Sequence, residues 1–180
     1  LELKKELSVE CLVKPVSAGA TYGFFEKSVA ETTNPSYLLF QSLGKPIFRV
    51  VKAGNQDAEA SGKLVTTAYS HLVGTFEPTK SKLYVNGTLE AEKTIAAGEI
   101  TTGAGKSYIG VLAPGTLVPL NGNLDELAIY NKPLSAAQVA EHAAQVTLGR
   151  PGEVQALEAK KKIIALTPSE VEVTYEPSGS

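Results

Sequence analysis

The stretch Asn121-Gly-Asn-Leu-Asp-Glu-Leu-Ala-Ile-Tyr-Asn-Lys-Pro-Leu-Ser135 joins a strand signal directly to a helix signal. Its middle part, residues 124–130, is rich in apolar side chains and lies between turn-forming residues, which predicts a strand. Ser135 is followed three residues later by Gln138, the spacing of a capping box that satisfies two backbone N–H groups at a helix start. We therefore expect a short Ala-rich helix over residues 136–145, directly after the strand.

Short strand signals separated by turn residues fill most of the chain before this stretch. Residues 7–13 alternate apolar and polar side chains, the period of a half-buried strand, and Cys11 falls on their apolar face. Asn86-Gly87 is the strongest hairpin signal, because both residues tolerate the positive φ of a type I′ turn. Residues 53–63 are polar and predict mostly loop. Further strand-like runs are residues 22–25, 37–40, 47–51, 71–76, 83–85 and 108–112.

This series of short strands favours an all-β fold over a βαβ fold. We expect an antiparallel two-sheet jelly-roll sandwich with one short helix after the last core strand. The length of 180 residues suits about one domain with a full hydrophobic core. The chain starts at Leu1 and contains no Met, so we expect a processed chain or a segment of a longer protein.

Charge and composition exclude several classes of function. Lys plus Arg (17) against Asp plus Glu (19) give a net charge of −2, so no basic field marks a nucleic-acid partner. No apolar run reaches the roughly 18 residues of a membrane span, and we expect no membrane insertion. The single cysteine, Cys11, excludes an internal disulfide and a multi-cysteine metal site. We predict that it is a small buried hydrophobe rather than a reactive thiol.

Gly103-Ala-Gly-Lys-Ser107 resembles the end of a phosphate-binding loop. The full pattern needs a further glycine where Ile100 stands. It also needs a strand before the loop and a helix after it, whereas this segment lies between strand-like runs. A loop without a nucleotide site is the better interpretation.

The side chains that could catalyse a reaction form no recognisable set. Nothing in the sequence places His71 or His142 beside a strained serine or beside Cys11, so ordinary packing or surface histidines are expected. Hydrolysis of a sugar needs two opposed carboxylates. Asp125 and Glu126 are neighbours on a predicted strand and should point to opposite faces, so they cannot form that pair. We predict that the chain is not an enzyme and has no catalytic residues.

Three blocks of sequence resemble the laminin-G-like, concanavalin-A-like jelly-roll family, which occurs in bacterial surface proteins and phage tail proteins. The blocks are residues 7–15, residues 69–76 with 82–87, and residues 108–110 with 121–135. They stand in the family's order, and the Gly-x-x-Asp-Glu strand that leads into a Leu-Ser helix start is the most specific of them. Family members often carry Trp where this chain has Leu12 and Tyr69. The family's opening strand is missing or very short, so either the chain begins within the domain or residues 171–175 supply the pairing.

The resemblance implies a jelly-roll domain over residues 1–149. Residues 150–180 would form a C-terminal extension, which is an extra strand, an arm or a linker to a neighbouring domain. Asp125 is then expected to turn inward and hold loop N–H groups, and Glu126 to face solvent. We expect no cofactor and no metal ligands, since no motif in this chain matches the family's calcium positions.

The family resemblance also implies a function. We expect a non-catalytic recognition module, part of a larger protein, that binds carbohydrate or a protein receptor on a cell or virion surface. The alternative is a structural or assembly module of a virion, a tail or capsid decoration component that contacts neighbouring subunits. Both place the chain outside the cell or on a virion surface, with polar loops over residues 30–36 and 54–62 available for hydrogen bonds. The candidate ligand-binding residues are Asn34, Asn55 and Asp57, and the tyrosines considered for stacking are Tyr22, Tyr37 and Tyr108.

Overall fold

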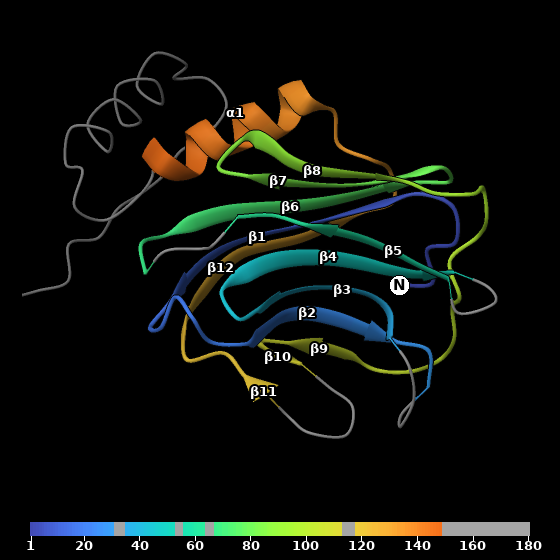
Figure 1. The fold of residues 1–180 in the computed structure, drawn as a ribbon, viewed down its shortest axis with the longest axis horizontal. Helices are drawn as coiled ribbons and strands as arrows, with labels where there is room; N and C mark the ends of the chain where they lie inside the picture. The colour runs from blue at the N-terminus through green and yellow to red at the C-terminus, as the bar shows by residue number, and fades with distance from the viewer. Residues whose placement is uncertain (31–34, 53–55, 64–66, 113–117, 149–180) are drawn as a thin grey trace, which may run out of the picture. The chain divides into compact units, whose positions relative to one another are not determined.

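The computed structural model describes residues 1–30, 35–52, 56–63, 67–112 and 118–148. Within these ranges the chain forms twelve strands followed by one helix (Figure 1). The elements are β1 Leu7–Pro15, β2 Tyr22–Ser28, β3 Pro35–Ser42, β4 Lys45–Lys52, β5 Gln56–Ser61, β6 Ser70–Glu77, β7 Lys80–Val85, β8 Thr88–Thr94, β9 Ser107–Ile109, β10 Val111–Leu112, β11 Val118–Pro119, β12 Gly122–Tyr130 and α1 Ala136–Leu148.

The chain divides into two compact units, residues 1–143 and residues 144–180. All twelve strands belong to the first unit, and α1 passes from the first unit into the second. Residues 149–180 lie outside the described ranges. The predicted extension over residues 150–180 and the pairing suggested for residues 171–175 therefore stay predictions.

Two five-stranded antiparallel sheets make up most of the first unit. The first sheet has the order β12-β1-β6-β7-β8, and the second has the order β5-β4-β3-β2-β9 (Figure 1). The short strands β10 and β11 pair only with each other. The predicted all-β, two-sheet antiparallel sandwich is thus confirmed, and α1 directly follows β12 as expected.

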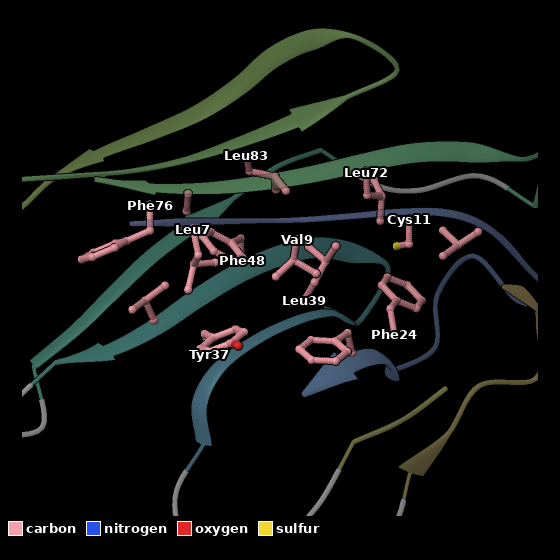
Figure 2. Packing of buried hydrophobic residues seen from close by; sticks show 14 of the residues in the cluster. Leu7, Val9, Cys11, Phe24, Tyr37, Leu39, Phe48, Leu72, Phe76 and Leu83 are labelled. Atoms are coloured by element: carbon pink, nitrogen blue, oxygen red, sulfur yellow. The ribbon is translucent and has the colours of Figure 1, made fainter. Parts of the chain in front are cut away.

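The core lies between the inner faces of the two sheets, because a strand presents alternate side chains to opposite faces. The fully buried inward side chains of β1 are Leu7, Val9, Cys11 and Val13. Figure 2 shows side chains of β1 facing those of the second sheet, among them Phe24, Tyr37, Leu39 and Phe48. Burial, followed by the nearby charge of Glu10, raises the pKa of the Cys11 thiol, so this cysteine is the unreactive hydrophobe that was predicted.

One predicted loop is a strand. Within residues 53–63, which predicted mostly loop, Gln56–Ser61 form β5 and pair with β4 along its length. Ala60 lies opposite Phe48 and is 2% exposed, so a small side chain faces the core here. The prediction was wrong because alanine and the polar residues around it favour strands weakly, whereas pairing with a buried neighbour strand overrides that preference.

The predicted helix start is confirmed. The backbone N–H of Gln138 donates to Ser135 Oγ at 3.3 Å, and the backbone N–H of Ser135 donates to Gln138 Oε1 at 3.0 Å. These are the two reciprocal bonds of a capping box. Leu134 and Val139 flank this cap and are both buried in one small apolar cluster on the outer side of the first sheet. The helix continues to Leu148, slightly beyond the predicted end.

Two tight hairpin turns have the same backbone shape but different sequences. Asn86-Gly87 joins β7 to β8 with φ values of 50° and 83°, the positive pair of the predicted type I′ turn. Leu43-Gly44 joins β3 to β4 with φ values of 47° and 81°. Leucine is a poor residue for positive φ, and Leu43 is also 74% exposed. The backbone at Leu43 is therefore held in a strained conformation by the hairpin around it.

Leu43→Asn should stabilise the domain by about 0.5–1 kcal/mol. Asparagine tolerates positive φ, and the change also removes an exposed apolar side chain from water. The measurement is the free energy of unfolding in urea. Leu43→Ala serves as the control, because it removes the same apolar surface without gaining tolerance for positive φ. If Leu43→Asn and Leu43→Ala changed the free energy of unfolding equally, backbone strain at Leu43 would be contradicted.

Candidate binding face of the second sheet

The candidate residues predicted from polar loops are not all within the described ranges. Asn34 and Asn55 lie outside them. Asp57 lies in β5, where its backbone is opposite Val51, and not in a loop as expected. The loop prediction failed at Asp57 for the same reason as in the rest of β5, because pairing with β4 extends the strand through this residue.

The three tyrosines considered for stacking differ in exposure. Tyr22 and Tyr37 are buried in the core, at 8% and 0% exposed, so neither ring is available to a ligand. The Tyr37 hydroxyl donates to the Leu1 carbonyl at 3.0 Å, and burial raises its pKa to about 12. Tyr108 is half-buried on the edge strand β9, so it is the one of the three that keeps part of its ring outside the core.

A row of residues crosses the second sheet on the face that points away from the core. Neighbours in the row are opposite each other in the strand register, in the order Tyr108, Glu26, Leu38, Arg49 and Glu59. The adjacent residue in each of the three central strands belongs to the core, namely Phe25, Leu39 and Phe48. Because side chains alternate along a strand, the row must lie on the outer face.

Arg49 and Glu59 form a polar pair at the β5 end of this row. Arg49 Nε and Nη2 donate to Glu59 Oε2 at 2.8 and 2.5 Å. The Arg49 guanidinium lies over the ring of Phe40, 5.5 Å from its centroid. Arg49 and Glu59 side chains are 33% and 35% exposed, so a ligand can reach both. The ring and the ion pair together hold the guanidinium in one orientation.

An apolar cluster supports the row from the same face. Its buried members are Leu38, Phe40 and Ile47, with Leu112 of β10 packed against them. β10 lies directly on β2, since a Cβ on Gly23 would be 2.1 Å from the backbone nitrogen of Leu112. The glycine thus allows a second chain segment to lie against the outer face and to form one wall beside the row.

Glu26 is a fully buried carboxylate in this row. It is 0% exposed, and its Oε1 accepts a hydrogen bond from Ser28 Oγ at 3.0 Å. Buried carboxylates are rare without such partners. The groups of the outer face that a polar ligand could reach are therefore the Arg49 guanidinium, the Glu59 carboxylate and the half-buried ring of Tyr108.

Sequence analysis missed this site because its residues are far apart in the chain. Arg49 and Glu59 meet only through the pairing of β4 with β5, and β5 was predicted as loop. An alternating run of polar and alanine residues at 56–61 was the available signal.

The segment that resembles a phosphate-binding loop does not form one. Ser107 begins the strand β9, where that motif requires a helix. The carbonyls of Gly103 and Gly105 accept hydrogen bonds from Lys27 Nζ, so this segment packs against the end of β2. The interpretation as a loop without that motif is confirmed for the described backbone.

Glu126 faces solvent as expected, but the expectation that Asp125 turns inward was wrong. Both side chains are exposed, and Asp125 Oδ1 accepts the backbone N–H of Glu126 at 2.8 Å. Glu126 has a φ of 50° and lies in an irregularity of the pairing between β1 and β12. This bulge breaks the strict alternation from which opposite faces were inferred.

The two histidines are brought together although 71 residues of sequence numbering separate them. His71 and His142 both hydrogen-bond to Glu10, where ordinary unrelated packing was expected. Among the described residues, no group of three or more His, Cys, Asp or Glu side chains is arranged to hold a metal ion. No helix in the same ranges is long and apolar enough to cross a membrane.

Several solved structures share this fold. The sialidase carbohydrate-binding module CBM40 of Ruminococcus gnavus, solved bound to alpha2,3 sialyllactose, matches with a TM-score of 0.62 and 15% identity, over 78% of this chain and 83% of that one. The binding domain of Paraclostridial Mosquitocidal Protein 1 matches with a TM-score of 0.56 and 12% identity, over 82% of this chain and 39% of that one. The botulinum neurotoxin serotype G binding domain matches with a TM-score of 0.61 and 11% identity, over 82% of this chain and 38% of that one.

The chain thus spans about two fifths of the two toxin chains and most of the sialidase module. At these identities the likeness is one of fold. No curated protein sequence matches this chain. The sequence profile described as the Concanavalin A-like lectin/glucanases superfamily matches residues 1–140, which cover all twelve strands and the start of α1. The chain belongs to the concanavalin A-like lectin/glucanases superfamily.

Proposed function

We propose that this chain is a non-catalytic recognition module that binds carbohydrate on the outer face of the second sheet. The observation that carries the proposal is the Arg49–Glu59 pair, half-exposed and held over the Phe40 ring. Structures of the same fold include a sialidase carbohydrate-binding module bound to sialyllactose and the binding domain of a mosquitocidal toxin, which supports a binding role for this chain.

The chemistry of the face suits sugar hydroxyls. Both hydrogen bonds of the ion pair end on Glu59 Oε2, so Glu59 Oε1 is the oxygen that would accept from a ligand hydroxyl. The guanidinium supplies donors in a fixed plane, and Tyr108 adds a half-buried ring at the sheet edge. Groups held in place before binding lose little conformational entropy when a ligand arrives.

The spacing of the carboxylates argues against a glycosidase. Glu26 and Glu59 lie in one row, but β3 and β4 separate their strands. Three strand spacings of roughly 4.8 Å place the two backbones roughly 14 Å apart. Glycosidase carboxyl groups work at separations of about 5–9.5 Å. This pair therefore does not have the spacing of a glycosidase pair.

Arg49→Ala should weaken glycan binding about tenfold or more, because it removes charge-assisted hydrogen bonds worth at least about 1.4 kcal/mol. The probe is an array of neutral and acidic oligosaccharides, followed by titration calorimetry with the best glycan and competition by the free sugar. Lys80→Ala is the matched control, since Lys80 forms a comparably exposed ion pair with Glu92 in the first sheet. Saturable binding that Arg49→Ala leaves unchanged, or no glycan binding by the wild-type chain, would contradict the proposal.

The proposed module would act outside the cell, on a cell or virion surface, as part of a longer protein. Its ligand there could be a free glycan or the glycan of a receptor protein, and competition by the free sugar tests both. A structural role in a virion, with contacts to neighbouring subunits, is the alternative. Hydrogen exchange of residues 150–180 that slows only on assembly would favour that alternative over glycan recognition.

A further inference from the structure

The carboxylate of Glu10 collects three hydrogen bonds from three other elements. On β1, Glu10 is only 4% exposed and points to the outer face of the first sheet. His71 Nε2 of β6 lies 2.6 Å from Glu10 Oε1, and His142 Nδ1 of α1 lies 3.0 Å from the same oxygen. The Tyr130 hydroxyl of β12 donates to Glu10 Oε2 at 2.8 Å. An ionised carboxylate only accepts, so each ring nitrogen must carry the proton in its bond.

The first turn of α1 is anchored without any titratable group. The backbone N–H of Leu134 donates to Ser8 Oγ at 2.8 Å, and Ser8 Oγ donates to the Lys132 carbonyl at 3.0 Å. Val139 is fully buried in the apolar cluster beneath the helix. These contacts do not depend on pH between neutral and acid solution.

Near Ala140 and Ala143, α1 contacts the turn between β7 and β8. A Cβ on Gly87 would lie 3.1 Å from Ala143 Cβ and 3.3 Å from Ala140 Cα, so the helix packs against a bare turn there. Small side chains at this contact bury little apolar area. The hydrogen bonds of His142 to Glu10 attach this part of α1 to β1.

The charge state of Glu10 depends on these contacts. Burial by itself raises the pKa of Glu10, but hydrogen bonds from His71, Tyr130 and His142 outweigh burial, so the pKa lies below its ordinary value of 4.5. Burial and the hydrogen bond to Glu10 raise the pKa of Tyr130 to about 12, so this hydroxyl keeps its proton throughout.

The groups that face Glu10 come from every element packed on it. They are His71 from β6, Tyr130 with the nearby charge of Glu126 from β12, and His142 from α1, while the adjacent Cys11 thiol points to the opposite face of β1. A protonated Glu10 carries a donor O–H on one oxygen and loses the negative charge that strengthens these hydrogen bonds.

We propose that Glu10 is an acid-sensitive latch, which holds the His142 end of α1 on the first sheet while ionised and releases it when protonated. A carboxyl whose pKa is lowered by its hydrogen bonds in the folded domain stabilises those contacts above its ordinary pKa, and this stabilisation is lost as the pH falls through the lowered value. Release therefore begins below about pH 4.5.

Amide hydrogen exchange of the full chain, followed by NMR from pH 7 to pH 3 and corrected for intrinsic rates, tests the latch. Protection of residues 140–146 should fall about tenfold or more below pH 4.5, because the hydrogen bonds from His142 lose their ionised acceptor. Protection of β3 and β4 should stay unchanged over the same range. Glu10→Gln should lower the protection of residues 140–146 already at pH 7 and make it independent of pH.

Two further variants keep the test decisive. His142→Ala leaves the Glu10–His71 pair in place and should reproduce the loss at pH 7 even if Glu10→Gln folds poorly. Glu92→Gln, in an exposed ion pair of the first sheet, should behave as wild type. The proposal fails if α1 and β3–β4 lose protection together, if the change centres near pH 6.5, or if His142→Ala keeps wild-type protection at all pH values.

Discussion

Gly74→Val lowers the free energy of unfolding by about 3 kcal/mol and leaves a domain that melts far below wild type. Gly74 lies on β6 with its Cα facing the core, opposite Val9 and Leu83 on the neighbouring strands. A Cβ at this position would lie 2.2 Å from Cγ and Cδ2 of Phe48. Phe48 is fully buried, so its ring has nowhere to move without displacing the rest of the core (Figure 2).

The double variant separates this clash from a general intolerance of the strand. Phe48→Ala alone should cost about 3–5 kcal/mol, because it leaves a cavity. In the double variant Gly74→Val/Phe48→Ala, the loss of unfolding free energy should be clearly smaller than the sum of the two single losses. The valine side chain then fills part of the cavity that Phe48→Ala leaves. Gly19→Ala is the control, with no atom within 4 Å of its added Cβ. If urea denaturation showed that the two losses of unfolding free energy add, contact between a side chain at position 74 and Phe48 would be contradicted.

Lys27→Met should destabilise the domain by about 2–3 kcal/mol. Lys27 is 5% exposed, and its ammonium donates to the carbonyls of Ser28 at 3.1 Å, Gly103 at 2.9 Å and Gly105. Methionine keeps most of the volume but removes the donors, which leaves the carbonyls unsatisfied away from water. The segment from Gly103 to Lys106 should then detach from the end of β2, which it now holds through backbone hydrogen bonds.

The comparison is Lys82→Met, which removes an ammonium from a more exposed pair with Glu77 at 2.9 Å. Lys82→Met should lower the free energy of unfolding by no more than about 1 kcal/mol, because water replaces the lost partner. Thermal denaturation of both variants at pH 7 measures the difference, and hydrogen exchange at residues 103–106 locates it. Equal losses for the two lysines would show that burial of Lys27 does not matter.

The sequence predicted the parts of this protein that depend on a few neighbouring residues. Asn86-Gly87 has the backbone dihedrals that its two side chains allow, and Ser135 with Gln138 caps α1 as the spacing indicates. The alternation in β1 placed Cys11 in the core. The family blocks predicted the two-sheet sandwich, which the family comparison confirms over residues 1–140.

The candidate site was not predicted, because none of its elements carries a local signal. Arg49 and Glu59 meet through the pairing of β4 with a strand that lacks β-branched residues. Leu43 shows the opposite case, in which the hairpin imposes a positive φ that its side chain disfavours. The inward orientation predicted for Asp125 was wrong, since a bulge, which depends on the partner strand, shifts the alternation.

The amino-acid sequence alone was sufficient to predict the turn conformations, the helix cap and the alternating strands, and thus the class of fold. Each of these features depends on the conformational preferences of adjacent residues. Only the tertiary structure decided that Glu10 meets both histidines and that Arg49 lies between Phe40 and Glu59. Those contacts join residues from strands and a helix far apart in sequence. Their free energy comes from burial and charge in the assembled sandwich, so no short stretch of sequence contains it.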